Sequence, residues 1–473
     1  IVVSNGLLTG GTNTLFNVQD GGHLTLNNVT ITGNTADDQG AVCVQNGALL
    51  DLGYNDKNPS IVPQITGNTQ DGEARNLVVA DGARIRLNAE PLQAIGISYA
   101  DDMNASAPKE VMEGGRYAID GEQSSNTNKE NLITSDRSDC VIFYAYDKLI
   151  IKNKNTKILY WSPENYWYKL GWSNKQFYDR PLRQLKEIND ITVDEIKGSC
   201  SGATKTTITS PNHATFDKDK LLSYDFIFIN APAVNFTDEE IDSLNEYLNL
   251  GGRIYLQGEN AEMLLINSVI AYFAANVNAD FTLNQDYLIP KTASGGKNPK
   301  QNTTNPHAQK LLKGITAFVP SQATAIIPTN NAIPLLYADA QSLSSGQWVG
   351  NFPWMVDQPA GNKNGASWGN ITVITDVNYF VDQESYAKTL MQNLLNDTIT
   401  NRILAAAGVN PNAETTNAQA QISTTQYQTV TEALAKVRED GIVELLAGSN
   451  LTPASNELLY NTSSIKEMNG NTV

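Results

Sequence analysis

Cysteine is scarce in this chain of 473 residues and occurs at Cys43, Cys140 and Cys200. The wide spacing provides no CxxC metal motif, and three thiols cannot pair completely. A chain of this length also does not need a disulfide framework. We therefore expect buried or incidental thiols, no metal site and no cofactor.

Long hydrophobic runs are also missing. The longest, from Met263 to Val277, is interrupted by Asn267 and Ser268 and is shorter than a membrane span requires. Basic residues are in deficit, with 33 Lys and Arg against 50 Asp and Glu, for a formal net charge of −17. Such a field repels phosphate backbones and anionic lipids, so we expect no nucleic-acid partner and no membrane partner. An acidic surface suits an extracellular protein.

What the chain does contain is enough apolar sequence for several cores. Hydrophobic residues make up 41% of the chain, which indicates globular rather than disordered protein. The length predicts two to four domains. No signal peptide precedes Ile1, and the chain starts inside a repeating pattern, so we interpret it as a piece of a longer protein.

Residues 1–100 contain a weak internal repeat. The phrase Ile-Thr-Gly-Asn-Thr at 31–35 returns at 65–69, and glycine introduces alternating apolar runs at 22–26, 47–52 and 82–87. Alternation places apolar side chains on one face of each strand. Because such short runs bury that face only by stacking on one another, the repeat predicts a solenoid. Glycine and asparagine tolerate the left-handed corners, where asparagines can also form ladders.

The pattern resembles the right-handed parallel β-helices of bacterial surface proteins, a pectate-lyase-like fold. The resemblance rests on Gly40-Ala41-Val42, the phrase at 65–69 and the segments 95–98 and 134–136. It implies a terminal hairpin with strands at 141–144 and 149–151.

β-Helices also host polysaccharide-cleaving enzymes, which need clustered carboxylates and a basic residue on one face. The aspartates of the repeat are scattered along the sequence, so we expect solvated turns. They are Asp37, Asp38, Asp51 and Asp71. We expect His23 to be an ordinary surface residue.

A different pattern begins at Lys157. Strands are predicted at 158–161 and 191–193, with a helical stretch at 181–188 between them. The apolar run 224–230 is typical of a strand covered on both faces. A capping box at Thr237 and Glu240 then begins a helix that ends before a strand at 253–257. Together with a later strand at 371–376 and a helix at 385–395, this predicts a mostly parallel sheet with helices on both faces.

This part resembles the flavodoxin-like α/β fold of class I glutamine amidotransferases, over residues 157–400. The phrases at 237–257 and 369–376 carry the resemblance. Active members of that family place a nucleophilic cysteine on the turn after the strand at 253–257, and a histidine and a glutamate after the last strand. This chain has Gly258-Glu259-Asn260 at that turn, and Asp376 and Asn378 after the last strand. The resemblance therefore implies the fold without its catalytic cysteine.

Ligands of open α/β sheets bind beyond the carboxyl ends of the strands. The sequence offers a candidate cleft there, although polar residues at such ends also serve as helix caps. Its residues are Ser162, Glu164, Asn230, Gly258, Glu259, Asn260, Asp376 and Asn378. A candidate sugar-stacking surface consists of Trp161, Trp167 and Trp172, for which core packing is the alternative.

The patterns divide the chain into five predicted parts. They are the last coils of a β-helix at 1–100, a cap or linker with a hairpin at 101–156, the α/β domain at 157–400, a linker at 401–428 and the start of a second β-helix at 429–473. The last part rests on a predicted helix at 429–437 and a predicted strand at 442–446.

Three functions are compatible with these patterns. The first is a non-catalytic structural or adhesive module of a large secreted or surface-anchored bacterial protein, with glycans or host and other cell-surface proteins as partners. The second is a carbohydrate-binding or polysaccharide-processing protein that uses the β-helix face or the aromatic-rich α/β cleft. The third is a cysteine hydrolase in which Cys200 works with His213. The absent nucleophile favours the first.

Overall fold

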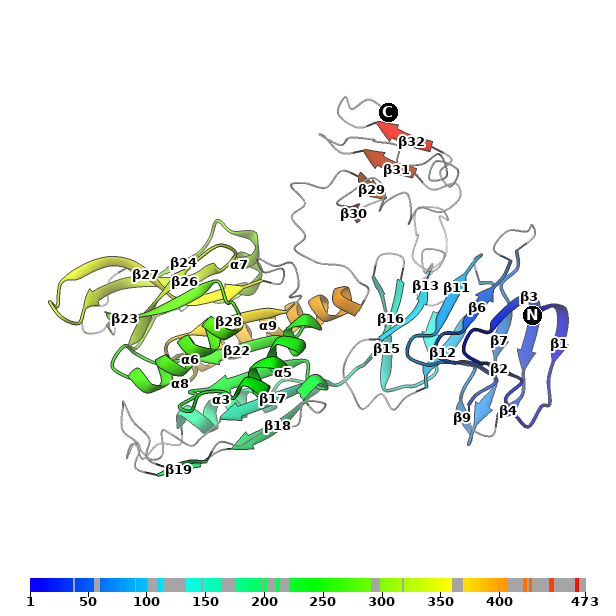
Figure 1. Cartoon of the computed structure of the whole chain (residues 1–473), viewed down its shortest axis with the longest axis horizontal. Coiled ribbons are helices and arrows are strands. Elements are labelled where there is room, and N and C mark those ends of the chain that lie inside the picture. Colours follow the sequence, from blue (N-terminus) through cyan, green and yellow to red (C-terminus); the bar gives the residue numbers. More distant parts are fainter. Residues whose placement is uncertain are drawn as a thin grey trace. The chain divides into compact units, whose positions relative to one another are not determined.

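The structure is a computed structural model that describes most of the chain. It covers residues 1–36, 39–54, 60–89, 91–100, 109–113, 133–145, 148–162, 176–197, 199–201, 210–212, 221–290, 298–316, 319–359, 369–406, 420–422, 425–427, 442–445 and 464–467. The chain divides into two compact units, Ile1–Pro411 and Asn412–Val473 (Figure 1). Each unit is described by itself.

Two parallel arrays of strands form the first part of unit one (Figure 1). One sheet contains β2 (Phe16–Val18), β5 (Val42–Val44), β10 (Leu77–Val79), β12 (Ile95–Tyr99) and β14 (Ile133–Ser135). The other contains β1 (Val2–Leu8), β3 (His23–Thr32), β6 (Leu49–Leu52), β11 (Arg84–Leu87) and β13 (Lys109–Glu113), followed by the antiparallel pair β16 (Lys148–Asn153) and β15 (Cys140–Ala145). This pair is the hairpin that the sequence predicts.

Short strands accompany these two sheets. β7 (Gln64–Thr66) pairs with β3, while β4 (Thr35–Ala36), β8 (Thr69–Gln70) and β9 (Glu73–Ala74) form a small third sheet. The chain visits the two main sheets in turn, and each strand pairs in parallel with a strand from the neighbouring passage. The predicted apolar faces, such as Leu24 with Leu26 and Ile85 with Leu87, are buried in one common core. Burial of this core is the main stabilising contribution to this part.

A ladder of buried amides links successive passages of the chain. The Nδ2 atom of Asn34 donates to Oδ1 of Asn68 at 2.8 Å, and Nδ2 of Asn68 donates to Oδ1 of Asn76 at 3.0 Å. Nδ2 of Asn76 then donates to the Asp136 carboxylate at 2.6 Å. The expected asparagine ladder is confirmed and extends to an aspartate.

The expectation of solvated turns is wrong for Asp51. This residue lies in β6 and is buried, and its carboxylate accepts two hydrogen bonds from Arg86 at 2.7 and 2.8 Å. The carboxylate also contacts Nε2 of His23 at 2.6 Å. His23 is half-exposed, as expected of a surface residue, but its ring is bound to Asp51. Asp71 does lie in an exposed turn, at a φ of 51°. Asp37 and Asp38 lie outside the described residues.

The second part of unit one is an α/β sheet with both faces covered. Its parallel half contains, in spatial order, β18 (Ile191–Lys197), β17 (Thr156–Ser162), β21 (Phe226–Asn230), β22 (Arg253–Gln257) and β28 (Asn370–Ile374). An antiparallel half follows with β27 (Trp348–Gln358), β26 (Ile333–Ser342), β23 (Phe281–Ile289) and β25 (Ala323–Pro328), and β24 (Lys300–Gln301) pairs with β26. The sequence predicted a mostly parallel sheet and gave no indication of this antiparallel half.

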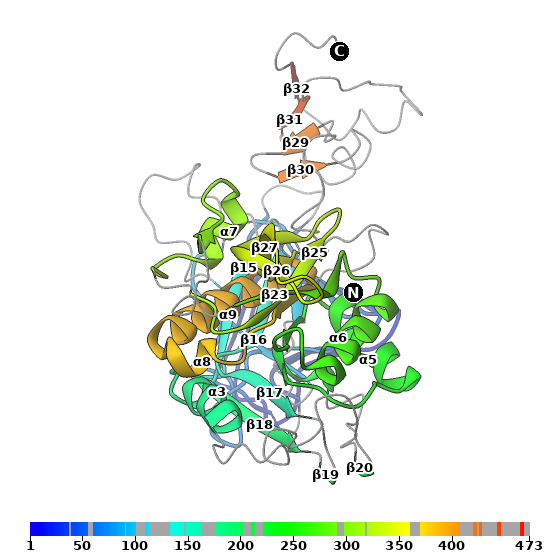
Figure 2. The same ribbon diagram turned by 90° about the vertical axis from the view of Figure 1, so that its left-hand side faces the viewer.

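Helices pack on the two faces of this sheet (Figure 2). One core contains α5 (Asp238–Asn249) and α6 (Leu264–Asn276) with the strand residues Leu159, Ile227 and Leu256. The other contains α3 (Gln176–Lys186), α7 (Pro306–Leu311), α8 (Tyr379–Asp382) and α9 (Glu384–Ala406) with Tyr160 and Phe228. The predicted α/β architecture with mostly parallel sheets is therefore present. The capping box of α5 forms as predicted, with Thr237 and Glu240 bonded to each other's backbone N–H.

Two boundaries differ from the prediction. Helix α9 continues to Ala406, past the expected end of the domain at 400, because Arg402 and Ile403 are buried. The expected linker 401–428 contains β29 (Ala420–Ile422) and β30 (Thr425–Tyr427), and the predicted helix at 429–437 lies outside the described residues. In unit two, β31 (Ile442–Leu445) matches the predicted strand and pairs in parallel with β32 (Ser464–Glu467).

No helix in the described part of the chain is long and apolar enough to cross a membrane.

Candidate functional site

The carboxyl ends of the parallel strands bring several predicted site residues together. Asn230 closes β21 and is the cross-strand partner of Gln257, which closes β22, while Ser162 closes the adjacent strand β17. All three side chains are buried. Ser162 and Asn230, which the sequence predicted for this edge of the sheet, do lie there, and the topology of parallel strands brings Gln257 there as well.

Asn230 is held by tyrosines on the α3 side of the sheet. Its Nδ2 atom donates to the Tyr160 hydroxyl at 2.7 Å, and that hydroxyl donates to the backbone oxygen of Tyr178 at 2.9 Å. The two rings meet edge to face with their centroids 5.3 Å apart. This hydrogen-bonded chain fixes the end of β21 against α3.

The turn after β22 is the position at which the amidotransferase resemblance of the sequence places a nucleophile. Here Gly258 packs tightly, because a Cβ atom added to it would lie 2.9 Å from the Ile270 side chain. The next side chain, Glu259, is buried and accepts hydrogen bonds from Nδ2 of Asn260 at 2.7 Å and from the backbone N–H of Val377 at 3.3 Å. The turn is thus occupied by a carboxyl group that bonds to the chain itself.

Asp376, directly after β28, is the second buried carboxyl group of this site. Its Oδ2 atom accepts from the backbone N–H of Ser321 at 2.5 Å, and its Oδ1 atom accepts from the backbone N–H of Asn378 at 2.8 Å. Burial, and then the nearby charge of Asp376, raise the pKa of Glu259 to about 8. Burial raises the pKa of Asp376 to about 7, and Asp382 adds to this. The pair, called the carboxyl pair below, favours a protonated carboxyl group near neutral pH.

The residues that complete the site come from α6 and from the beginning of β25, two elements that the sequence did not connect with the strand ends. Asn267 of α6 accepts from the backbone N–H of Glu259 at 3.3 Å and donates to Thr324 at 2.9 Å. The Thr324 hydroxyl donates in turn to the backbone oxygen of Glu259 at 2.7 Å. Ser321 and Thr324 precede or begin β25 in the antiparallel half, and no local pattern indicated that this strand returns to the site.

The expected sugar-stacking surface is wrong for Trp161. This side chain has 0% of its surface exposed and meets Phe236 edge to face within the α5–α6 core. It cannot stack on a sugar because no face of the ring reaches solvent. Trp167, Trp172, Glu164 and His213 lie outside the described residues. Cys200 belongs to β19 (Ser199–Ser201), which pairs with β20 (Ser210–Asn212), and its side chain lies outside them as well.

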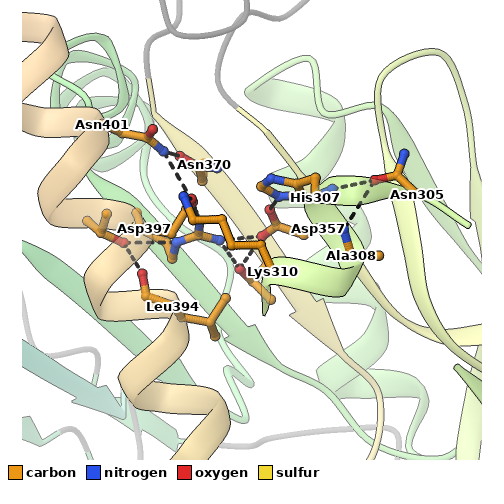
Figure 3. Close-up of polar contacts among 12 residues, drawn as sticks. Asn305, His307, Ala308, Lys310, Asp357, Asn370, Leu394, Asp397 and Asn401 are labelled. Atoms are coloured by element: carbon orange, nitrogen blue, oxygen red, sulfur yellow. Dashed lines mark hydrogen bonds and ion pairs between the residues drawn. The ribbon is translucent and has the colours of Figure 1, made fainter. Parts of the chain in front are cut away.

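A second polar cluster lies at the amino ends of the same strands (Figure 3). Arg253, the first residue of β22, is fully buried and bonds to Asp357 and, at 2.5 Å, to Asp397. His307 contacts the other oxygen of Asp357 at 2.7 Å, and Lys310 contacts Asp397 at 2.6 Å. Burial acts to raise the pKa of Asp357, but Arg253 and His307 outweigh it and hold this pKa at about 2. The cluster ties β22 and β27 to α7 and α9.

Neither polar cluster contains a set of protein ligands for a metal ion. Among the described residues, no group of three or more His, Cys, Asp or Glu side chains is arranged to hold one.

Comparison with known proteins gives distant likenesses. No known family matches the sequence, and no curated protein matches it. The "mmIFT52 N-terminal domain" is similar with a TM-score of 0.34 and 15% identity, over 52% of this chain and 97% of that one. A cytoplasmic protein from Salmonella typhimurium, STM3548, gives 0.29 and 13%, over 54% and 93%. A β-galactosidase from Rahnella sp. R3 gives 0.30 and 12%, over 52% and 32%. At these scores the likenesses carry no argument about fold or function.

Proposed function

We propose that the chain is a non-catalytic structural and adhesive module of a large secreted or surface-anchored bacterial protein. The observation that carries the proposal is the turn after β22. Its side chains are engaged in hydrogen bonds within the chain, since Glu259 accepts from the backbone N–H of Val377 and Oδ1 of Asn260 accepts from the backbone N–H of Glu262. A group engaged and buried in this way stabilises the fold and is not available to attack a substrate.

The proposal includes two finer assignments of fold. The parallel arrays of residues 1–100 are the last coils of a right-handed β-helix and residues 101–156 are its cap, supported by the alternation of the chain between the sheets and by the buried amide ladder. The sheet that follows is an amidotransferase-like domain without its nucleophile, supported by the parallel order β17-β21-β22-β28 and by the capping box of α5. Both assignments make the module a scaffold.

The absence of catalysis is tested with a panel of glutaminase, amidase, esterase and glycosidase substrates. We expect the full chain to turn over none of them above the rate of a heat-denatured sample. Turnover that disappears in the Glu259→Gln or the Asp376→Asn variant, while the variant remains folded by circular dichroism, would overturn the proposal.

The cellular location is tested by labelling intact cells of the source organism with antibodies against this chain. Labelling of unpermeabilised cells, or recovery of the antigen from the medium, is the expected result. Labelling that requires permeabilisation contradicts the surface assignment and leaves the assignment of catalysis untouched.

A further inference from the structure

One face of the β26–β27 hairpin combines an exposed tryptophan with fixed polar side chains. Asp339 is the cross-strand partner of Asn351, and Gln341 is the partner of Trp348. Cross-strand partners share a face of the sheet, so these four side chains lie on one side. Ala338 and Ala340 point the other way and are buried in the core, which directs the four residues outward. We call this set the hairpin face.

The polar half of the hairpin face is held in place by amides. Nδ2 of Asn298 donates to Oδ2 of Asp339 at 2.9 Å, and Nδ2 of Asn351 donates to Oδ1 of the same carboxylate at 3.2 Å. Nδ2 of Asn351 also lies 3.3 Å from the backbone oxygen of Asn298. These solvent-exposed bonds fix the Asp339 carboxylate between two amide groups. The polar half of the hairpin face therefore presents both hydrogen-bond donors and acceptors.

The aromatic half of the face lies beside the hairpin turn, which is tied down by its own backbone. Trp348 exposes 38% of its surface, and the backbone N–H of Ser342 donates to the oxygen of Gln347 at 2.9 Å. The N–H of Leu343 donates to the oxygen of Asp286 at 2.8 Å, which anchors the turn to β23. A surface ordered before binding loses less conformational entropy when a ligand arrives.

We propose that the hairpin face binds a neutral glycan. An indole ring offers a flat apolar surface to the C–H face of a sugar ring, while the adjacent amides and the carboxylate can bond to its hydroxyl groups. The charge of the chain, −17 overall with Asp339 at the centre of the face, repels acidic sugars and leaves neutral ones as the ligand class. The inference rests on the proposed adhesive function and deepens it by naming the ligand class and the surface. The sequence alone does not bring Asn298 and Asp339 beside this tryptophan, because the pairing of the strands decides it.

The test is binding of the full chain to three immobilised surfaces, which carry neutral oligosaccharides, acidic oligosaccharides or deglycosylated protein. We expect binding to some neutral oligosaccharides, a loss of tenfold or more in Trp348→Ala, and a loss of similar size in Asp339→Ala. Leu343→Ala is the matched control, since this side chain is also exposed and apolar in the same hairpin but is not part of the hairpin face. It should bind as the unchanged chain does.

The outcomes separate the two proposals. Binding to deglycosylated protein alone, or equal losses in Trp348→Ala and Leu343→Ala, would show an apolar protein-docking surface, which overturns the glycan inference and leaves adhesion standing. Binding to acidic oligosaccharides alone overturns the inference as well. Binding to none of the surfaces contradicts both adhesion and the glycan inference. Circular dichroism of each variant ensures that lost binding is not lost folding.

Discussion

At the scale of single residues, the carboxyl pair is the most unusual feature of the α/β part. Glu259 and Asp376 lie at the ends of neighbouring parallel strands, and each bonds to backbone N–H groups of another segment. The pair thereby joins the turn after β22, the turn after β28 and the segment before β25. The charges that raise the two pKa values are themselves acidic, since Asp376 acts on Glu259 and Asp382 of α8 acts on Asp376. Removing the protons therefore places negative charge against negative charge in a buried position.

This arrangement predicts a loss of stability at alkaline pH. Because the folded-state pKa values of about 8 and about 7 lie above the ordinary values near 4, the folded state binds protons more tightly than the unfolded state. The contribution of the carboxyl pair to the free energy of unfolding is therefore largest below pH 4, and it decreases as the pH rises to about 8. We expect a loss of several kcal/mol between pH 5 and pH 9, measured by urea denaturation.

The Glu259→Gln variant isolates this effect, since it keeps the shape of the side chain and removes one of the two charges. Its urea midpoint should vary less between pH 5 and pH 9 than that of the unchanged chain. Glu262→Gln serves as control, because it removes an exposed carboxylate from the same turn. A pH dependence that is identical in all three proteins would contradict the explanation.

At the scale of elements, the amide ladder connects strands that are far apart in the sequence. Asn68 is its most heavily bonded member, with Nδ2 donating to the backbone oxygens of Ile31 and Thr66 as well as to Asn76. It also accepts from the backbone N–H and the Nδ2 of Asn34. One side chain therefore satisfies several buried backbone groups of neighbouring passages at once.

Replacing Asn68 by alanine should destabilise unit one by about 2–4 kcal/mol, because it leaves several buried donors and acceptors without partners. Thermal or urea denaturation measures the change. Asn17→Ala is the comparison, since Asn17 is exposed and its side-chain bonds lie at the surface. Its effect should stay within about 0.5 kcal/mol. Equal effects of the two substitutions would argue that the ladder carries no special stability.

The elements recovered from the sequence are those with a complete local signal. Helix α5 has its capping box, an apolar stripe and a terminal glycine pair within one short stretch, and β22 follows directly. The end of α9 has no such signal. It is set by contacts that are remote in the sequence, where Ile403 packs against Ile150 of β16 and Arg402 donates to the backbone oxygen of Tyr224. Tertiary contacts, and not local helix propensity, therefore determine where α9 ends.

At the scale of the whole molecule, Arg253 joins segments from across the α/β part. Its guanidinium group bonds to Asp357 in β27, and to Asp397 and Thr398 in α9. We expect Arg253→Met to cost about 3–5 kcal/mol, because it removes the one fully buried cation that these two buried carboxylates share. The measurement is the unfolding midpoint in urea at neutral pH.

Lys310→Met is the matched control for this network. Lys310 pairs with the same Asp397 but is exposed, so its loss should cost less than about 1 kcal/mol. If both substitutions cost the same, the buried arginine would not be the residue that joins the network. If Arg253→Met has no effect, the network is dispensable for stability.

The candidate site shows the same division between local and remote information. The sequence placed Asn230, Glu259 and Asp376 at one edge of the sheet, because strand ends can be predicted from apolar runs. It could not indicate what holds the two acidic residues, since Asp376 accepts from the backbone N–H of Ser321 and the backbone oxygen of Glu259 accepts from Thr324, which are both remote in the sequence. Likewise Asp51 is far from His23 and Arg86 in the sequence, but pairing of β3, β6 and β11 brings the three side chains together.

The pairing of β3, β6 and β11 has a practical consequence for engineering. Thr25, Asp51 and Arg86 occupy one row across these strands, yet unequal lengths of chain separate them. The extra residues lie between the strands and leave the pairing register unchanged. Loop length and strand register are therefore decoupled here, and a foreign peptide inserted between β6 and β7 should be displayed without disturbing the packed interior.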